Sequence, residues 1–86
     1  MAKYTINIKP SARKELESLS DILLARMVQK IEGLADNPRP SGCKKLRGYK
    51  DLWRIRVGDY RVVYIVDDAH EHVSITRIAH RRDVYE

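Results

Sequence analysis

Three arginines dominate the candidate chemistry of this sequence. Arg54 and Arg56 precede a Gly58-Asp59 pair, and Arg61 follows it. Both flanks of that pair are rich in β-branched and aromatic residues, so the Gly-Asp loop predicts a tight β-hairpin. A guanidinium presents rigid, forked N–H donors that match a phosphate group. Three of them on one hairpin point to a phosphate, or to the negative charge that develops on phosphorus during its transfer.

The register of the hairpin decides whether these arginines share a face. A two-residue loop places Arg56 directly opposite Arg61, and Arg54 on the same side. The other side is apolar and is predicted to face the core, with Trp53, Ile55, Val57, Val62 and Tyr64. Facing like charges destabilise a sheet by some tenths of a kcal/mol, up to about 1 kcal/mol. The acidic residues of the hairpin fall at its ends, which favours an external anion. A solvated outer face is the alternative interpretation.

Other kinds of site find little support in the sequence. It has no carboxylate pair at a useful spacing, no Cys/His ligand spacing for zinc, and no P-loop or GxGxxG motif. The remaining Arg, Tyr and His residues suit cleavage of RNA without metal or cofactor, in which the substrate's own 2′-hydroxyl attacks the phosphate. Arg56 and Arg61 are the candidates for charge stabilisation, and Arg54 for holding the backbone. The candidates for binding the flanking RNA are the basic residues before the hairpin, Lys44, Lys45 and Arg47.

The general base must be a different residue type, because the pKa of arginine lies above about 12. His80 has an unperturbed pKa near about 6.5. Tyr85 needs nearby positive charge to lower a pKa of about 10, and the basic C-terminal stretch can supply it. Either ring could instead stack on an unpaired base. The residues leave this choice open.

Length and composition limit the other possibilities. The 86 residues are enough for one small domain, residues 1–86, with a thin core. The net charge of +5 favours a polyanionic or acidic partner. A single cysteine, Cys43, excludes an intrachain disulfide and indicates a reducing compartment. We find neither an apolar run long enough for a membrane span nor a signal peptide, so we expect a cytoplasmic protein.

Hydrophobic periodicity predicts the elements that position these residues. Residues 3–9 alternate as a half-buried strand. Pro10 begins a first helix, Ser20 caps a second, and Asn37-Pro38 ends it. The apolar stripe of the second helix is Leu24, Met27, Val28, Ile31, Leu34 and Ala35. The hairpin and a strand over residues 72–80 follow. The order predicts an α+β fold, a two-layer sandwich of an antiparallel sheet with a helical hairpin on one face.

The last strand is expected to bring further candidates to the arginine side. A tight turn at residues 67–72, followed by strict alternation, makes Arg61 face Ile78. His80 then shares the open face of the sheet with the three arginines. Directly beyond it, on a tail that could bend toward the same face, follow Arg81 and Tyr85.

Three stretches of the sequence resemble the RelE/ParE superfamily of toxins: YTINIKPSARKEL, KLRG followed by WRIRVGDYRVVY, and IAHRRDVY. The resemblance is closest to RelE-type mRNA interferases and covers nearly the whole chain. It implies the strand-helix-helix-three-strand fold and the toxin of a type II toxin-antitoxin system. Such toxins are ribosome-dependent endoribonucleases that cleave mRNA in the A site. The implied partners are the 70S ribosome with its mRNA and a cognate antitoxin whose acidic or amphipathic segment wraps the toxin.

The resemblance also implies roles for single residues. Arg61 falls on the central catalytic arginine of the family, and Arg81 on a second arginine near the C-terminus. Tyr85 falls on the C-terminal catalytic tyrosine. Lys45 and Arg47 fall on basic residues that contact RNA.

One departure from the family pattern affects the choice of base. Arg54 and Arg56 stand where well-studied members carry lysines, which can carry a proton more readily. The difference favours Tyr85 as the base, with His80 behind it. The alternative function is that of a ParE-like toxin, which inhibits DNA gyrase and cleaves no RNA. The three-arginine face favours the interferase.

Overall fold

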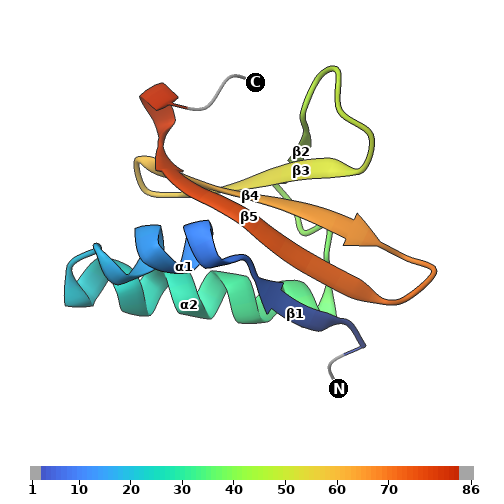
Figure 1. The fold of residues 1–86 in the computed structure, drawn as a ribbon, viewed down its shortest axis with the longest axis horizontal. Helices are drawn as coiled ribbons and strands as arrows, with labels where there is room; N and C mark the ends of the chain where they lie inside the picture. Colours follow the sequence, from blue (N-terminus) through green and yellow to red (C-terminus); the bar gives the residue numbers. More distant parts are fainter. Residues whose placement is uncertain (1–2, 84–86) are drawn as a thin grey trace.

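The predicted sheet and helices are present in the computed structural model, which describes residues 3–83. In chain order the elements are β1 (Thr5–Ile8), α1 (Pro10–Glu17), α2 (Asp21–Asp36), β2 (Lys44–Lys45), β3 (Leu52–Val57), β4 (Tyr60–Asp67), β5 (His72–His80) and the 3-10 helix η1 (Arg81–Asp83). The strands form one sheet in the order β1-β5-β4-β3-β2, and both helices pack on one face of it (Figure 1). The two-layer α+β prediction is confirmed. Within residues 3–83, no helix is long and apolar enough to cross a membrane.

The sheet is mixed rather than wholly antiparallel. β3, β4 and β5 are antiparallel neighbours, as predicted. β1 instead runs parallel to β5 at the sheet edge, with Thr5 opposite His72 and Ile8 opposite Ile75. Alternation of apolar residues indicates which face of a strand is buried, but it does not indicate whether the strand runs parallel or antiparallel to its neighbour. The parallel direction of β1 was therefore not predicted from the sequence. The two-residue strand β2 pairs with β3 and is too short to show any periodicity.

The helices begin where their capping residues predict. Pro10 is the first residue of α1, and the Ser20 hydroxyl accepts a hydrogen bond of 3.4 Å from the Leu23 N–H at the start of α2. The predicted apolar stripe of α2 is wrong at one position. Val28 is 36% exposed, because it lies at the border of the face that contacts the sheet. The buried residues of the stripe are Met27, Ile31 and Leu34.

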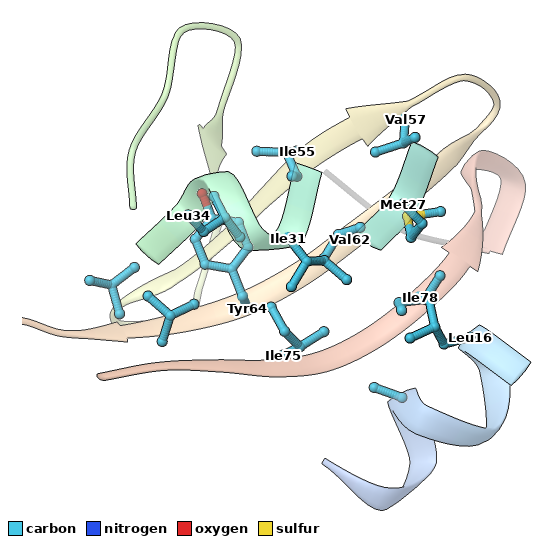
Figure 2. Packing of buried hydrophobic residues seen from close by; sticks show 13 residues of the cluster. Leu16, Met27, Ile31, Leu34, Ile55, Val57, Val62, Tyr64, Ile75 and Ile78 are labelled. Carbon is cyan, nitrogen blue, oxygen red and sulfur yellow. The ribbon is translucent and has the colours of Figure 1, made fainter. Parts of the chain in front are cut away.

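The core lies between the helices and the inner face of the sheet (Figure 2). Its buried residues are Ala12, Leu16, Met27, Ile31, Leu34, Ile55, Val57, Val62, Tyr64, Val66, Val73, Ile75 and Ile78. Tyr64 is fully buried, and its hydroxyl donates a hydrogen bond of 2.7 Å to the Pro38 carbonyl. Burial raises the pKa of Tyr64, which keeps this hydroxyl protonated as a donor.

The register of the arginine hairpin is the predicted one. Arg56 lies opposite Arg61, and Val57 lies opposite Tyr60. Gly58, in the turn, has a φ of 61°, a left-handed conformation that glycine adopts without steric cost. The predicted inner residues of the hairpin pack in or against the core. The three arginines therefore lie on the outer face, away from the helices.

The hairpin formed by β4 and β5 contains a β-bulge. Near the turn, Tyr64 faces Ile75 as predicted. The next pair is Val63 with Arg77, so Thr76 is an extra residue on β5. The Thr76 hydroxyl donates a hydrogen bond of 3.1 Å to the carbonyl of Val63. Beyond this point every residue of β5 lies on the face opposite to that expected from strict alternation.

Two predictions about β5 are wrong because of this bulge. Arg61 faces Ala79, and not Ile78, which is buried in the core. His80 faces Tyr60, with the ring centroids 5.6 Å apart. Since Tyr60 packs against the core, His80 lies on the inner side of the sheet and does not share the face of the arginines.

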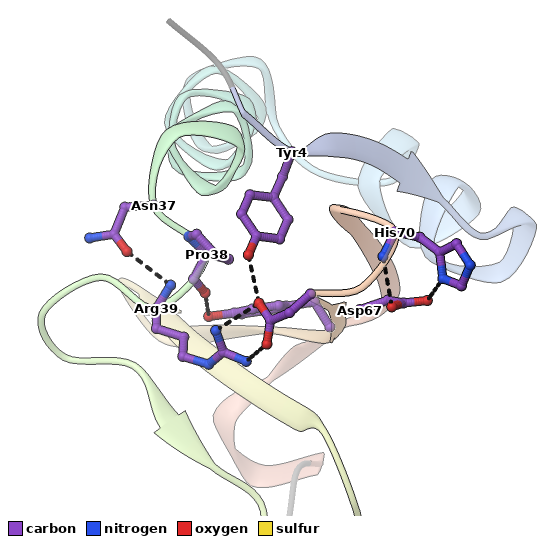
Figure 3. A network of polar contacts seen from close by, with 8 residues as sticks. Tyr4, Asn37, Pro38, Arg39, Asp67 and His70 are labelled. Carbon is purple, nitrogen blue, oxygen red and sulfur yellow. Dashed lines mark hydrogen bonds and ion pairs between the residues drawn. The ribbon is translucent and has the colours of Figure 1, made fainter.

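A polar network fastens β1 to the β4–β5 turn and to the loop after α2 (Figure 3). The Tyr4 hydroxyl donates to Asp68 Oδ1 at 2.6 Å, and Arg39 donates to both carboxylate oxygens at 3.2 and 2.8 Å. The Arg39 guanidinium also lies 5.0 Å from the ring centroid of Trp53. The hydrogen bonds from Arg39, and then from Tyr4, hold the pKa of Asp68 at about 2.

This network predicts a loss of stability in acid. The pKa of Asp68 is about 2 in the folded chain and about 3.9 in an unfolded one, so its contribution is present above pH 4 and is lost as the pH falls toward 2. We expect the free energy of unfolding, measured with urea between pH 2 and pH 5, to fall less steeply in Asp68→Asn than in wild type. Asp36→Asn, at the exposed end of α2, is the control and should match wild type. Equal slopes for Asp68→Asn and wild type would contradict the assignment.

Candidate functional site

The candidate site is built on the outer face of β3 and β4. We call Arg54, Arg56 and Arg61 together the arginine face. Arg56 and Arg61 are direct cross-strand partners, and Arg54 lies two residues before Arg56 on the same side of β3. Arg54 is 3% exposed and Arg61 is 8% exposed, whereas Arg56 is exposed. A merely solvated outer face does not account for the burial of two of the three side chains.

Backbone carbonyls orient the two buried guanidinium groups. Arg54 Nη1 donates to the Gly42 carbonyl at 3.2 Å, and Arg61 Nη1 donates to the Tyr60 carbonyl at 3.3 Å. Each contact fixes the orientation of one planar guanidinium group. A donor that is already held in place costs no reorganisation when charge develops on a bound group. The arginine face is therefore suited to hold and stabilise an oxyanion.

The basic residues before the hairpin form one border of the site. Lys44 pairs with Arg54, so it lies on the arginine side of the sheet, while Lys45 pairs with Trp53 and belongs to the other side. Both lysines are exposed, and so is Arg47 in the loop that follows. Figure 1 shows this loop, between β2 and β3, rising from the sheet on the side away from the helices. The structure therefore brings Lys44 to the arginine face and directs Lys45 away from it.

The C-terminal helix η1 rises from the opposite end of the sheet, also away from the helices (Figure 1). The Arg81 N–H donates a hydrogen bond of 2.7 Å to the Asp59 carbonyl, which ties η1 to the turn of the arginine hairpin. Arg81 is exposed at this position. η1 and the loop over residues 46–51 therefore rise at opposite ends of the sheet, on the side that carries the arginine face (Figure 1). Tyr85 lies outside the described residues.

A cavity of about 680 Å³ adjoins the arginine face at the edge of the sheet. It lies between α2, the loop before β2 and the strand β3, and its lining includes Lys30, Ser41, Arg54 and Arg56. Three cations and a hydroxyl give its wall the chemistry of a phosphate or nucleotide site. The cavity extends the basic surface beyond the two facing arginines.

Sequence reasoning missed one cation on this side of the sheet. Arg77 pairs with Val63 after the bulge, which places it on the outer face. Its Nη1 donates a hydrogen bond of 3.0 Å to the Asp83 carbonyl in η1. The spacing of the apolar residues of β5 could have indicated the bulge, and with it the outer position of Arg77. Val73, Ile75 and Ile78 do not keep a period of two, as an unbroken strand would.

Comparison with known proteins places the chain among toxins. Residues 6–85 match the family described as "ParE toxin of type II toxin-antitoxin system, parDE". A Mycobacterium tuberculosis protein named Toxin RelE is 36% identical over 83 residues, which cover 95% of this chain and 86% of the relative.

Solved structures agree with this similarity. The matched chain of the archaeal RelE-RelB complex from Pyrococcus horikoshii OT3 gives a TM-score of 0.84 at 30% identity, covering 95% of this chain and 99% of that chain. The isolated E. coli RelE toxin gives a TM-score of 0.79 at 26% identity, covering 90% of this chain and 83% of that one.

Proposed function

This chain belongs to the ParE toxin family of type II toxin-antitoxin systems, within the RelE/ParE superfamily, and from that premise we propose that it is a RelE-type mRNA interferase. In this proposal it enters the ribosomal A site and cuts the mRNA there, which inhibits translation. The observation that carries the proposal is the direct pairing of Arg56 with Arg61 on the outer face of the sheet. Two facing cations can contact a single phosphate together.

The proposed reaction is attack of the substrate's 2′-hydroxyl oxygen on the adjacent phosphorus. A new O–P bond forms and the bond to the 5′ oxygen breaks, leaving a 2′,3′-cyclic phosphate and a 5′-hydroxyl. A base removes the 2′-hydroxyl proton, and an acid returns a proton to the 5′ oxygen. Arg56 and Arg61 stabilise the extra negative charge on the phosphate oxygens, while Arg54 holds the neighbouring backbone.

Tyr85 is the general base that we propose, because His80 lies on the inner side of the sheet. His80 faces Tyr60, and its Nδ1 accepts from Arg82 Nε at 3.3 Å. Neither contact points it toward the arginine face. A cation beside a phenol lowers its pKa, and Arg81 is our candidate for that role.

Two partners follow from this proposal. Solved relatives include the RelE-RelB complex of Pyrococcus horikoshii and the intact E. coli RelBE toxin-antitoxin complex. We therefore propose that a cognate antitoxin binds this chain through an acidic or amphipathic segment, to which the net charge of +5 is complementary. The other partner is the 70S ribosome carrying mRNA, which places the activity in the cytoplasm.

Primer extension in a purified translation system tests the function directly. We expect discrete cuts within A-site codons when the wild-type chain is added to translating ribosomes. The cuts should disappear when ribosomes are omitted. Intact mRNA on stalled or running ribosomes would contradict the proposal.

The description of the matching family names ParE, which supports a second candidate function. A ParE-like toxin would inhibit DNA gyrase and leave mRNA intact. A supercoiling assay with purified gyrase distinguishes the two functions. We expect no inhibition, and inhibition without mRNA cleavage would establish the second function instead.

Lys44 and Arg47, at the border of the arginine face, should contribute to RNA binding rather than to the cleavage step. We expect Lys44→Ala/Arg47→Ala to raise KM for programmed ribosomes and to leave kcat within about twofold. Because each phosphate contact on single-stranded RNA contributes about 0.7 to the slope of log affinity against log salt, the slope should fall by about 1.4. Lys14→Ala, exposed on α1 on the other side of the molecule, is the matched control. An unchanged salt slope in the double variant would argue against the assignment.

A further inference from the structure

The bulge on β5 receives a carboxylate from α1. The N–H of Ile78 donates a hydrogen bond of 2.9 Å to Oε1 of Glu15. Pairing of β5 with its outer neighbour β1 ends at Ile75, whose carbonyl accepts from the Lys9 N–H. Among residues 3–83, no strand continues beyond that point on the β1 side of β5, whereas β4 stays paired on the other side as far as His80. Glu15 therefore supplies to β5 an acceptor that a neighbouring strand would otherwise provide.

The same carboxylate also reaches Arg77, the first residue after the bulge. Glu15 Oε2 lies 3.8 Å from Arg77 Nε, and Arg77 Nη1 donates to the Asp83 carbonyl at 3.0 Å. One side chain thus contacts two successive residues of β5 and, through Arg77, the helix η1. The Glu15–Arg77 pair is partly exposed, so the hydrogen bond to Ile78 is the stronger of its two contacts.

The geometry of the bulge determines what surrounds Arg61. With the bulge in place, Ala79 is the cross-strand neighbour of Arg61. Its side chain is small, and two residues later the Arg81 N–H binds the Asp59 carbonyl. The apolar pattern of β5 already requires a bulge, since it buries Ile78. The contacts of Glu15 with Arg77 and Ile78 fix the position of the backbone between the bulge and Arg81.

We propose that Glu15 is a positioning residue of the cleavage site. By holding Ile78 and Arg77 at the bulge, it places Ala79 against Arg61 and sets η1, with Arg81, at the end of the arginine face. This inference rests on the proposed function, because the role is defined by RNA cleavage. Glu15 itself acts from the helix layer and contacts no substrate.

Steady-state cleavage on programmed ribosomes separates positioning from binding. Misplacement of catalytic groups by about 1 Å can cost about 10²-fold in rate, so we expect Glu15→Ala to lower kcat by about ten- to hundredfold. KM should stay within about twofold. Glu15→Gln keeps an oxygen acceptor for Ile78 and should remain within about threefold of the wild-type kcat. Glu17→Ala, an exposed carboxylate on the same helix, should match wild type.

Two outcomes would overturn the inference: a folded Glu15→Ala variant with the wild-type kcat, or a Glu15→Gln variant as impaired as Glu15→Ala. If Glu15→Ala does not fold, Glu15→Asp replaces it. The shorter side chain keeps the charge and loses the reach to Ile78, so the same loss of kcat is expected. A wild-type kcat in Glu15→Asp would equally overturn the inference.

A second readout does not depend on the reaction. In ¹⁵N-resolved NMR spectra we expect Glu15→Ala to shift the amide resonances of both Ile78 and Arg81, and Glu17→Ala to leave both unchanged. An Arg81 amide that does not move would refute the positioning role, whatever the activity. If the wild-type chain cleaves no mRNA while both amides shift, the proposed function fails and the structural role of Glu15 stands.

Discussion

Arg61→Ala is expected to lower the kcat of mRNA cleavage by about 10²- to 10³-fold, the loss typical of removing one preorganised donor from a developing oxyanion. Arg61 is 8% exposed, is held by the Tyr60 carbonyl and faces Arg56 across the hairpin. The substitution also removes one of two facing like charges. The free energy of unfolding should therefore stay within about 1 kcal/mol of wild type.

Steady-state cleavage on programmed ribosomes, followed by primer extension, measures this loss. Thermal unfolding of the same preparation shows whether the variant is folded. Arg61→Lys keeps the charge and loses the forked donors, so its kcat should lie between those of wild type and Arg61→Ala. Arg13→Ala, exposed on α1, removes the same charge from the helix side and should cleave normally. A folded Arg61→Ala variant that cuts mRNA at the wild-type rate would refute the catalytic assignment.

Tyr64→Ala is expected to cost about 3–5 kcal/mol of the free energy of unfolding, because it empties an aromatic volume in a fully buried site. A domain of this size has a total stability of about 5–10 kcal/mol, so much of the variant should be unfolded at 37 °C. Tyr64→Phe keeps the ring and removes the hydroxyl that binds the Pro38 carbonyl at 2.7 Å. It should cost about 1–3 kcal/mol, the penalty of leaving a buried acceptor without its donor.

Urea unfolding followed by Trp53 fluorescence measures both variants. Tyr49→Ala is the matched control, since Tyr49 is 63% exposed in the loop after β2, and its loss should change stability by less than about 0.5 kcal/mol. A Tyr64→Phe variant as stable as wild type would show that the bond to Pro38 contributes nothing net. In that case the ring alone would account for the loss in Tyr64→Ala.

Elements with a strong local signal could be predicted from the sequence. The Gly58-Asp59 turn fixes a two-residue loop, and that loop alone determines that Arg56 faces Arg61. Pro10 and Ser20 mark the two helix starts because each has a specific role at a helix N-terminus. These features depend on neighbouring residues only.

Features that depend on distant contacts could not be predicted in the same way. The direction of β1 follows from its pairing with β5, which its own alternation cannot encode. The uneven apolar spacing of β5 indicates the bulge at Thr76. It does not indicate that the Ile78 N–H after the bulge donates to Glu15, which lies on a helix far away in the sequence. His80 was misplaced for this reason, since one extra residue reverses the faces of a strand.

In the candidate site, too, the residues on one local hairpin were predicted correctly, and those placed by pairing with another strand were not. Its centre, Arg54, Arg56 and Arg61, lies on one local hairpin and was predicted correctly as a shared face. Lys44 and Lys45 are adjacent in sequence and were grouped together, yet their pairing with β3 directs them to opposite faces. The roles assigned to all these residues, and to Arg81 and Tyr85, stay predictions until the variants are measured.

The parallel pairing of β1 with β5 sets a limit on when the molecule can finish folding. Thr5 is synthesised early, but its partner His72 emerges only after both helices and the arginine hairpin. Such long-range pairing is slow, because a large loop must close before the contact is gained. The strand that closes the sheet also carries Ala79 to Arg61 and leads into Arg81. A nascent chain that ends before β5 therefore lacks Ala79 and Arg81 and cannot assemble the complete site.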